Sequence, residues 1–78
     1  MKQRRNPYLA MYHEEYEAMR EKLSAYQEAG VSLTLSGRLS SPGYLAYVSV
    51  VRERGRYMTD YIPDEDGKLC EIRFDKVE

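Results

Sequence analysis

The stretch NPYLAMYHEEYEAMREKLSAYQEAG, residues 6–30, decides the fold, because its start, its periodicity and its end all indicate a single helix. Asn6 can accept hydrogen bonds from the free amides of a first helical turn, and Pro7 suits the first helical position, where no N–H is needed. Gly30 can adopt the left-handed conformation that commonly ends a helix. We therefore predict a helix of about 23 residues between Asn6 and Gly30, roughly 34 Å long at 1.5 Å per residue.

Aromatic and apolar residues recur every three or four positions along this stretch, which places them in one arc of the helix surface. We expect that arc to be buried and the opposite, acidic face to be exposed. Residues 1–5, which precede the helix, carry three basic side chains and are expected to form a flexible basic tail. The expected buried residues are Tyr8, Tyr12, Tyr16, Met19, Leu23 and Tyr26, and the expected exposed acids are Glu14, Glu17, Glu21 and Glu28.

After Gly30 the period of the apolar residues changes to two, which predicts strands. Most of the expected strands alternate apolar and polar residues, as in a sheet with one buried face, but one of them is apolar on both faces, as in a central strand. Turn-forming residues separate the strands at SSPG (40–43) and PDEDG (63–67). The predicted strands are residues 31–36, 44–53, 56–62 and 70–75.

The two-residue connection Arg54-Gly55 would join the second and third strands as a hairpin in which Val51 faces Met58 and Ser49 faces Asp60. Short loops favour antiparallel neighbours, and one helix can cover only one side of a sheet. The predicted fold is therefore α+β: a two-layer sandwich in which one long N-terminal helix packs on one face of a four-stranded antiparallel β-meander. Residues 6–78 are expected to form a single domain.

Composition narrows the class of protein. A chain of 78 residues and 9.2 kDa has room for one domain only. Twelve Lys and Arg against thirteen Asp and Glu give a net charge of −1, which does not indicate a strongly basic nucleic-acid-binding protein. The single cysteine, Cys70, cannot form an internal disulfide, and no apolar run is long enough for a membrane span. We expect a cytoplasmic protein that does not bind membranes.

Motifs that carry catalytic or metal chemistry are incomplete in this sequence. His13 and Glu17 could ligate a metal from adjacent helical turns, but the chain has no second histidine to complete a zinc motif. Residues 64–67 (DEDG) lack the ligand spacing of a calcium loop, and Cys70 is expected in the core without a base to activate it. We therefore predict no enzymatic activity, no cofactor, no metal site and no small-molecule substrate.

The uncovered face of the predicted sheet carries the main functional hypothesis. Apolar side chains there would have no second helix to cover them, and their burial would favour association. We expect a non-catalytic protein that binds another protein, or itself as a homodimer, as an inhibitory or accessory module of the kind that phages and mobile elements encode. The residues expected to form this surface are Tyr47, Val51, Met58, Ile62 and Leu69.

A second hypothesis, from a different class, is binding of single-stranded nucleic acid. Basic residues gather around the predicted hairpin and in the N-terminal tail, and nearby tyrosines could stack on bases. Glu53 lies among these arginines and the helix is acidic, which weakens this alternative. The residues that would contact nucleic acid are Arg38, Arg52, Arg54 and Arg56, with Lys2, Arg4 and Arg5 of the tail.

Overall fold

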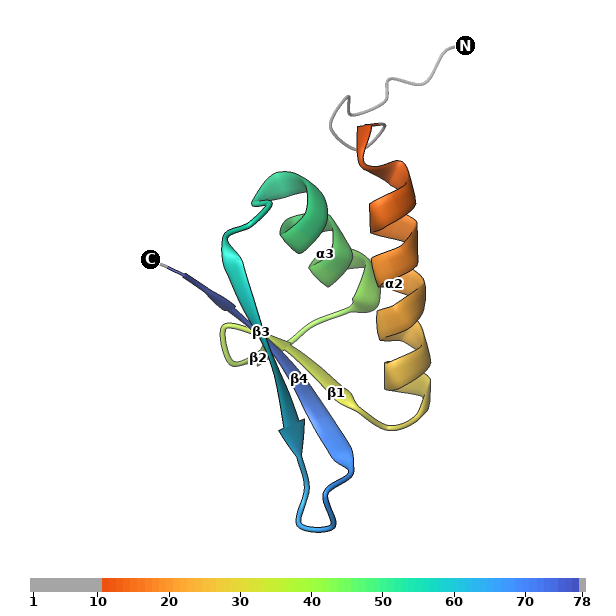
Figure 1. Ribbon diagram of the computed structural model, residues 1–78, viewed down its shortest axis with the longest axis vertical. Helices are drawn as coiled ribbons and strands as arrows, with labels where there is room; N and C mark the ends of the chain where they lie inside the picture. Colours follow the sequence, from red (N-terminus) through yellow and green to blue (C-terminus); the bar gives the residue numbers. More distant parts are fainter. Residues whose placement is uncertain (1–10, 78) are drawn as a thin grey trace.

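The computed structural model describes residues 11–77, which form a helix, a second helical segment and a four-stranded sheet (Figure 1). The α+β class and the number of strands agree with the prediction from the sequence. The elements in chain order are α2 (His13–Glu28), β1 (Ser32–Leu35), β2 (Arg38–Leu39), α3 (Pro42–Ala46), the π-helical segment η1 (Tyr47–Arg52), β3 (Tyr57–Pro63) and β4 (Leu69–Lys76).

Helix α2 ends where the sequence predicts. Gly30 has a φ of +95°, its N–H donates to the Gln27 carbonyl, and the N–H of Val31 donates to the Tyr26 carbonyl, each at 3.0 Å. These two bonds form a Schellman motif, which satisfies carbonyls that the helix itself leaves free. The described helix has 16 residues and is shorter than predicted. The predicted start at Asn6 and the predicted tail, residues 1–5, lie outside the described residues.

The sheet is mixed, so the prediction of an all-antiparallel meander is wrong. Its strand order is β2-β1-β4-β3. β1 pairs with β2 and β4 pairs with β3 in antiparallel fashion, but β1 and β4 are parallel. A parallel pair needs a long crossover connection, and here the chain between β1 and β4 includes the helical segment and the edge strand β3.

Residues 44–53, predicted as a central strand, are helical instead. Ser41 is the N-cap of α3 and its hydroxyl accepts a hydrogen bond from the Tyr44 N–H at 3.2 Å, with Pro42 at the start of the helix. A short apolar run fits a buried strand and a buried helix equally well, and here the burial of Leu45 and Val48 favours the helix that Ser41 and Pro42 begin. The predicted hairpin register, with Val51 facing Met58 and Ser49 facing Asp60, is therefore wrong as well.

The segment η1, Tyr47–Arg52, is wider than an α-helix. The Glu53 N–H donates to the Val48 carbonyl, five residues earlier, at 2.8 Å, and the Ser49 hydroxyl donates to the Leu45 carbonyl at 2.6 Å. The valines favour strands by propensity, but burial against the rest of the molecule overrides that preference. The buried residues of this segment are Leu45, Ala46, Val48, Val50 and Val51.

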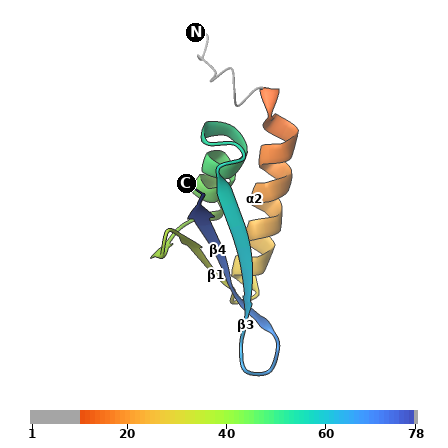
Figure 2. The same ribbon diagram turned by 60° about the vertical axis from the view of Figure 1, so that its left-hand side comes forward.

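The core lies between the helices and one face of the sheet, so the predicted two-layer arrangement is confirmed (Figure 2). Leu23 of α2 and Leu45 of α3 pack against side chains from the two central strands, and all of these residues are nearly inaccessible to solvent. Both helices therefore cover the same face. The core cluster is Leu23, Val31, Leu33, Leu45, Ile72 and Phe74. Cys70 is a free, half-buried thiol outside this cluster.

Candidate interaction surface

The uncovered face of the sheet is polar at its centre. Directly paired residues share a face, so Thr34, Glu71 and Arg73 lie together on the side away from the helices. The Thr34 hydroxyl and the Arg73 Nε both donate to Glu71 Oε2 at 3.0 Å. These two hydrogen bonds, from Arg73 first and Thr34 second, lower the pKa of Glu71. Asp60 on β3 pairs with Arg73 and continues the polar surface.

The structure separates the five residues that were expected to form one apolar patch. Tyr47 and Val51 are on η1, where Val51 is buried, and Leu69 packs against the core. Only Met58, which is 56% exposed, and the half-buried Ile62 lie on the uncovered face. The described residues therefore form no continuous apolar patch on this face, because residues 44–53, the predicted strand that was to supply Tyr47 and Val51, are helical.

One exposed apolar residue of this face was missed. Leu39 pairs with Thr34, so it lies on the uncovered face at the far edge, and it is 80% exposed. Ser36 and Gly37 both have positive φ, 51° and 83°, which makes them a two-residue hairpin turn. A Ser-Gly pair followed by Arg-Leu was the sequence signal for this short strand.

β3 forms one edge of the sheet, and among residues 11–77 no strand pairs with its outer side (Figure 2). The Val77 N–H donates to the Arg56 carbonyl at 2.8 Å, which makes Arg56 and Val77 a hydrogen-bonded pair of the antiparallel ladder. Such pairs alternate with non-bonded pairs, so every second residue after Arg56 directs its N–H and C=O toward β4. The backbone groups of Tyr57, Thr59 and Tyr61 therefore point outward from the edge.

The side chains of these three residues lie on the helix side of the sheet, yet the helices leave two of them uncovered. Thr59 is exposed and Tyr61 is 50% exposed. The Lys22 Nζ donates to the Tyr61 hydroxyl at 3.3 Å and lies 5.7 Å from the ring centroid, so its main contact is with the hydroxyl. The helical layer therefore stops short of the edge at Thr59.

The first residue of β3 is fixed by a polar network. The Tyr57 hydroxyl donates to Glu53 Oε2 at 3.0 Å, and Lys76 Nζ lies 2.6 Å from Glu53 Oε1. The hydrogen bond from Lys76, with that from Tyr57, lowers the pKa of Glu53, while burial and the bond to Glu53 raise the pKa of Tyr57. This network ties the end of η1 to both β3 and β4, so the edge strand is held in place at that end.

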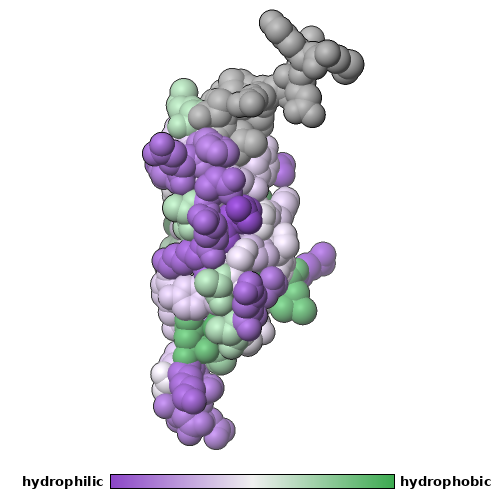
Figure 3. All heavy atoms as spheres, turned by 90° about the vertical axis from the view of Figure 1, so that its right-hand side faces the viewer, coloured by the Kyte–Doolittle hydropathy of each residue, from purple (hydrophilic) through white to green (hydrophobic). Residues whose placement is uncertain are grey.

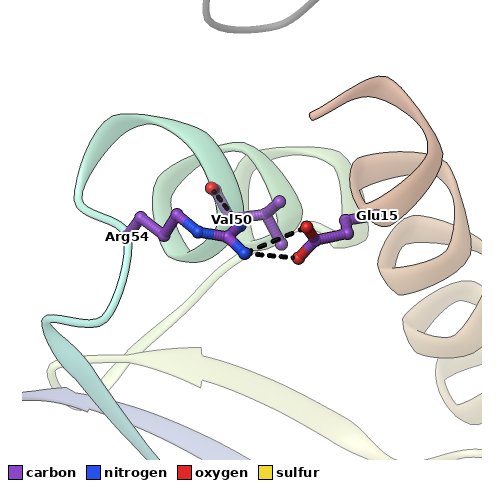
Figure 4. A network of polar contacts seen from close by, with 3 residues as sticks. All are labelled: Glu15, Val50 and Arg54. Atoms are coloured by element: carbon purple, nitrogen blue, oxygen red, sulfur yellow. Dashed lines mark hydrogen bonds and ion pairs between the residues drawn. The ribbon is translucent and has the colours of Figure 1, made fainter. Parts of the chain in front are cut away.

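The arginines proposed to contact nucleic acid are dispersed. Arg54 Nη2 lies 2.9 Å from both carboxylate oxygens of Glu15, and Arg54 Nη1 donates to the Val50 carbonyl at 3.2 Å (Figure 4). The Arg54 guanidinium also stacks over the Tyr12 ring, 4.3 Å from its centroid. Arg54 therefore links the connection before β3 to α2, and its charge is already paired.

The other three arginines are exposed, but they lie on different parts of the molecule. Arg38 is on β2 at one edge of the sheet, and Arg56 precedes β3 at the opposite edge. Arg52 ends η1. The structure therefore does not gather these side chains into one groove.

The residues considered for metal binding do not converge. Glu17 Oε1 lies 2.7 Å from Arg20 Nε, and no group of three His, Cys, Asp or Glu side chains within residues 11–77 could hold a metal ion. Among the described residues, a hollow of about 440 Å³ is lined by five consecutive residues of one segment, 11–15. None of the described helices combines the length and the apolar character needed to cross a membrane.

The outer side of α2 is hydrophilic (Figure 3). Glu14, Glu21 and Glu28 are exposed there, as predicted, whereas Glu17 is half-buried beside Arg20. The described residues of this surface supply charged side chains but do not converge on a binding or catalytic site. Comparison of the chain with protein-family models, with curated proteins and with solved structures finds no match. Its function must therefore be inferred from the described residues themselves.

Proposed function

We propose that this chain is a non-catalytic cytoplasmic protein that acts by binding a protein, either a different one or a second copy of itself, as an inhibitory or accessory module, and that β3 is its contact strand. The observation that carries the proposal is the open edge of β3, where Tyr57, Thr59 and Tyr61 direct backbone N–H and C=O groups outward. An exposed edge of this kind is a template for adding a strand from another chain. The free thiol of Cys70 fits a reducing compartment.

The side chains around this edge favour a protein ligand. Met58 and Tyr61 are about half exposed, on opposite faces of the same strand, and Val77 at the end of β4 is 46% exposed. A partner strand would bond to the backbone for affinity and would cover these side chains alternately for specificity. Each new backbone hydrogen bond contributes about 0.5–1.5 kcal/mol net. The sequence predicted a contact on the uncovered face of the sheet. The contact proposed here lies instead at the edge of the sheet.

Site-specific photo-crosslinking tests this function. A benzoylphenylalanine residue replaces Tyr61 at the edge or, as the matched control, Gln27, which is exposed on α2. After irradiation in cells, we expect a discrete protein adduct at position 61, absent at position 27 and reduced by an excess of the unlabelled chain. Equal adducts at both positions, or none at position 61, would contradict the proposal.

A further inference from the structure

We propose that the occupant of the β3 edge is a second copy of this chain, paired antiparallel with β3 about a twofold axis at Thr59. This inference rests on the proposed function and adds the partner and the register. It follows from the sequence YMTDYIP of β3, read together with the direction of its backbone groups. A second copy can pair with all the outward N–H and C=O groups of an edge strand only if the outward-facing residues of the two copies lie opposite one another.

Placing the axis at Thr59 meets this requirement. Thr59 then faces Thr59 of the second copy, and Tyr57 faces Tyr61 of the second copy on either side. Each hydrogen-bonded pair exchanges two N–H···O bonds, so the three facing pairs use every outward N–H from Tyr57 to Tyr61, about six bonds in all. Pro63, which has no N–H, falls outside the ladder. Aromatic and threonine cross-strand pairs are also among those that stabilise sheets.

The neighbouring registers are worse for identifiable reasons. An axis at Asp60 sets two carboxylates directly opposite each other and places Tyr57 opposite Pro63, which removes a donor. An axis at Tyr61 places Thr59 opposite Pro63 and leaves Tyr57 without a partner inside the strand. An axis at Met58 places Tyr61 opposite residue 55, which lies before the strand. One register therefore combines a complete ladder with no directly opposed like charges.

Charges on the other face are compatible with the Thr59 register. Asp60 then faces Met58 of the second copy, and Arg56 of that copy is a diagonal neighbour. The two Asp60 residues are also diagonal neighbours, whose backbone positions lie about 7–8 Å apart, and each pairs in the ladder with Arg73 of its own chain. Arg73 of each chain therefore offsets the electrostatic repulsion between the two Asp60 carboxylates.

The helical layer leaves room for this pairing. Directly facing residues point to the same side of a joined sheet, so the Thr59 and Tyr61 side chains of both copies meet on the helix side. Thr59 is exposed in one chain, and Tyr61 stays 50% exposed although Lys22 of α2 donates to its hydroxyl. The product is one continuous sheet with all helices on the same face, in which Thr59 and Tyr61 become covered. A strand of seven residues spans about 24 Å, so the contact belongs with small, concentration-dependent interfaces.

Charge substitution at the axis tests both the partner and the register. Sedimentation velocity from roughly 5 to 500 µM, a range suited to weak dimers, should show the wild-type mass rise from one copy toward two. Thr59→Lys and Thr59→Glu each oppose like charges at the axis, and each should weaken association at least tenfold. An equal mixture of the two variants should restore it, because Lys then faces Glu. The control pair Gln27→Lys and Gln27→Glu, on the exposed side of α2, should change nothing.

Three results would overturn the inference: a wild type that stays monomeric, a dimer that both Thr59 variants leave intact, or variants that stay monomeric when mixed. Circular dichroism verifies that the variants fold.

A second measurement needs no variant. In a sample mixed from isotope-labelled and unlabelled chains, nuclear Overhauser contacts should join the Tyr57 ring to the Tyr61 ring of the other copy. The absence of these contacts would exclude this register. A monomeric wild type that still crosslinks another protein at position 61 would refute self-pairing but retain the proposed function.

Discussion

Leu45→Ala tests whether residues 42–52 form a helix in the core. Leu45 is fully buried between α2 and the sheet. In the strand predicted from the sequence it would instead share the water-facing side with Tyr47 and Val51. Truncating a fully buried leucine removes its transfer free energy and leaves a cavity, which together cost about 2–5 kcal/mol. The total stability of a domain of this length is roughly 4–12 kcal/mol at 0.05–0.15 kcal/mol per residue, so the loss is a large fraction of it.

The measurement is urea unfolding followed by circular dichroism. We expect a loss of about 3 kcal/mol for Leu45→Ala, equivalent to a fall in Tm of about 12–24 °C for a domain of this size. The matched control is Tyr44→Ala, at the adjacent position, where the side chain is 47% exposed and the expected loss is about 1 kcal/mol or less. A loss below about 0.5 kcal/mol for Leu45→Ala would place this residue at the surface and refute the helical assignment.

Three further predictions concern the edge strand, the Glu53 network and nucleic acid. At concentrations too low for association, the amide of Asp60, which faces β4, should exchange with deuterium at least about tenfold more slowly than that of Thr59, which faces outward; equal rates would refute the alternation. The pKa of Glu53 is lowered in the folded chain, so its contribution to stability is complete above its ordinary value of 4.5 and is lost as the pH falls below it. Glu53→Gln should therefore reduce the slope of stability against pH in this acidic range, and an unchanged slope would show that the bond to Lys76 contributes nothing. For nucleic-acid binding, the alternative hypothesis, the test is fluorescence anisotropy with labelled oligonucleotides: affinity that falls steeply with salt would support it, and no binding at low salt, which the dispersed arginines favour, would exclude it.

The sequence predicts those elements whose signals are local. The end of α2 is fixed by Gly30, and β4 by strict alternation around Ile72 and Phe74, which are both in the core. β1 and β3 also lie close to their predicted positions, because turn residues mark their limits on both sides. The two-layer arrangement follows because the apolar arc of one helix needs one apolar sheet face.

The parallel pairing of β1 with β4 could not be predicted in the same way. It joins Leu33 to Ile72, which are far apart in the sequence, and no turn signal specifies such a pair. Residues 44–53 were misassigned because a run that is apolar on both faces has no periodicity that would distinguish a strand from a helix. Ser41 and Pro42 could equally start a turn or a helix, and only the burial of Leu45 and Val48 in the folded chain favours the helix.

Because residues 44–53 were predicted as a strand, the sequence did not indicate that the edge of β3 would be a candidate site. In the predicted meander, residues 56–62 lay between two other strands, so both edges of that strand would have been paired. Once residues 44–53 leave the sheet, β3 loses one neighbour and its outward backbone groups become available, while Tyr47 and Val51 leave the uncovered face. The uncovered face then consists mainly of charges and hydroxyls around Arg73, which satisfy one another. Among the described residues, the outward backbone groups of β3 can therefore form hydrogen bonds to a partner strand, whereas the polar groups of the face already bond to one another.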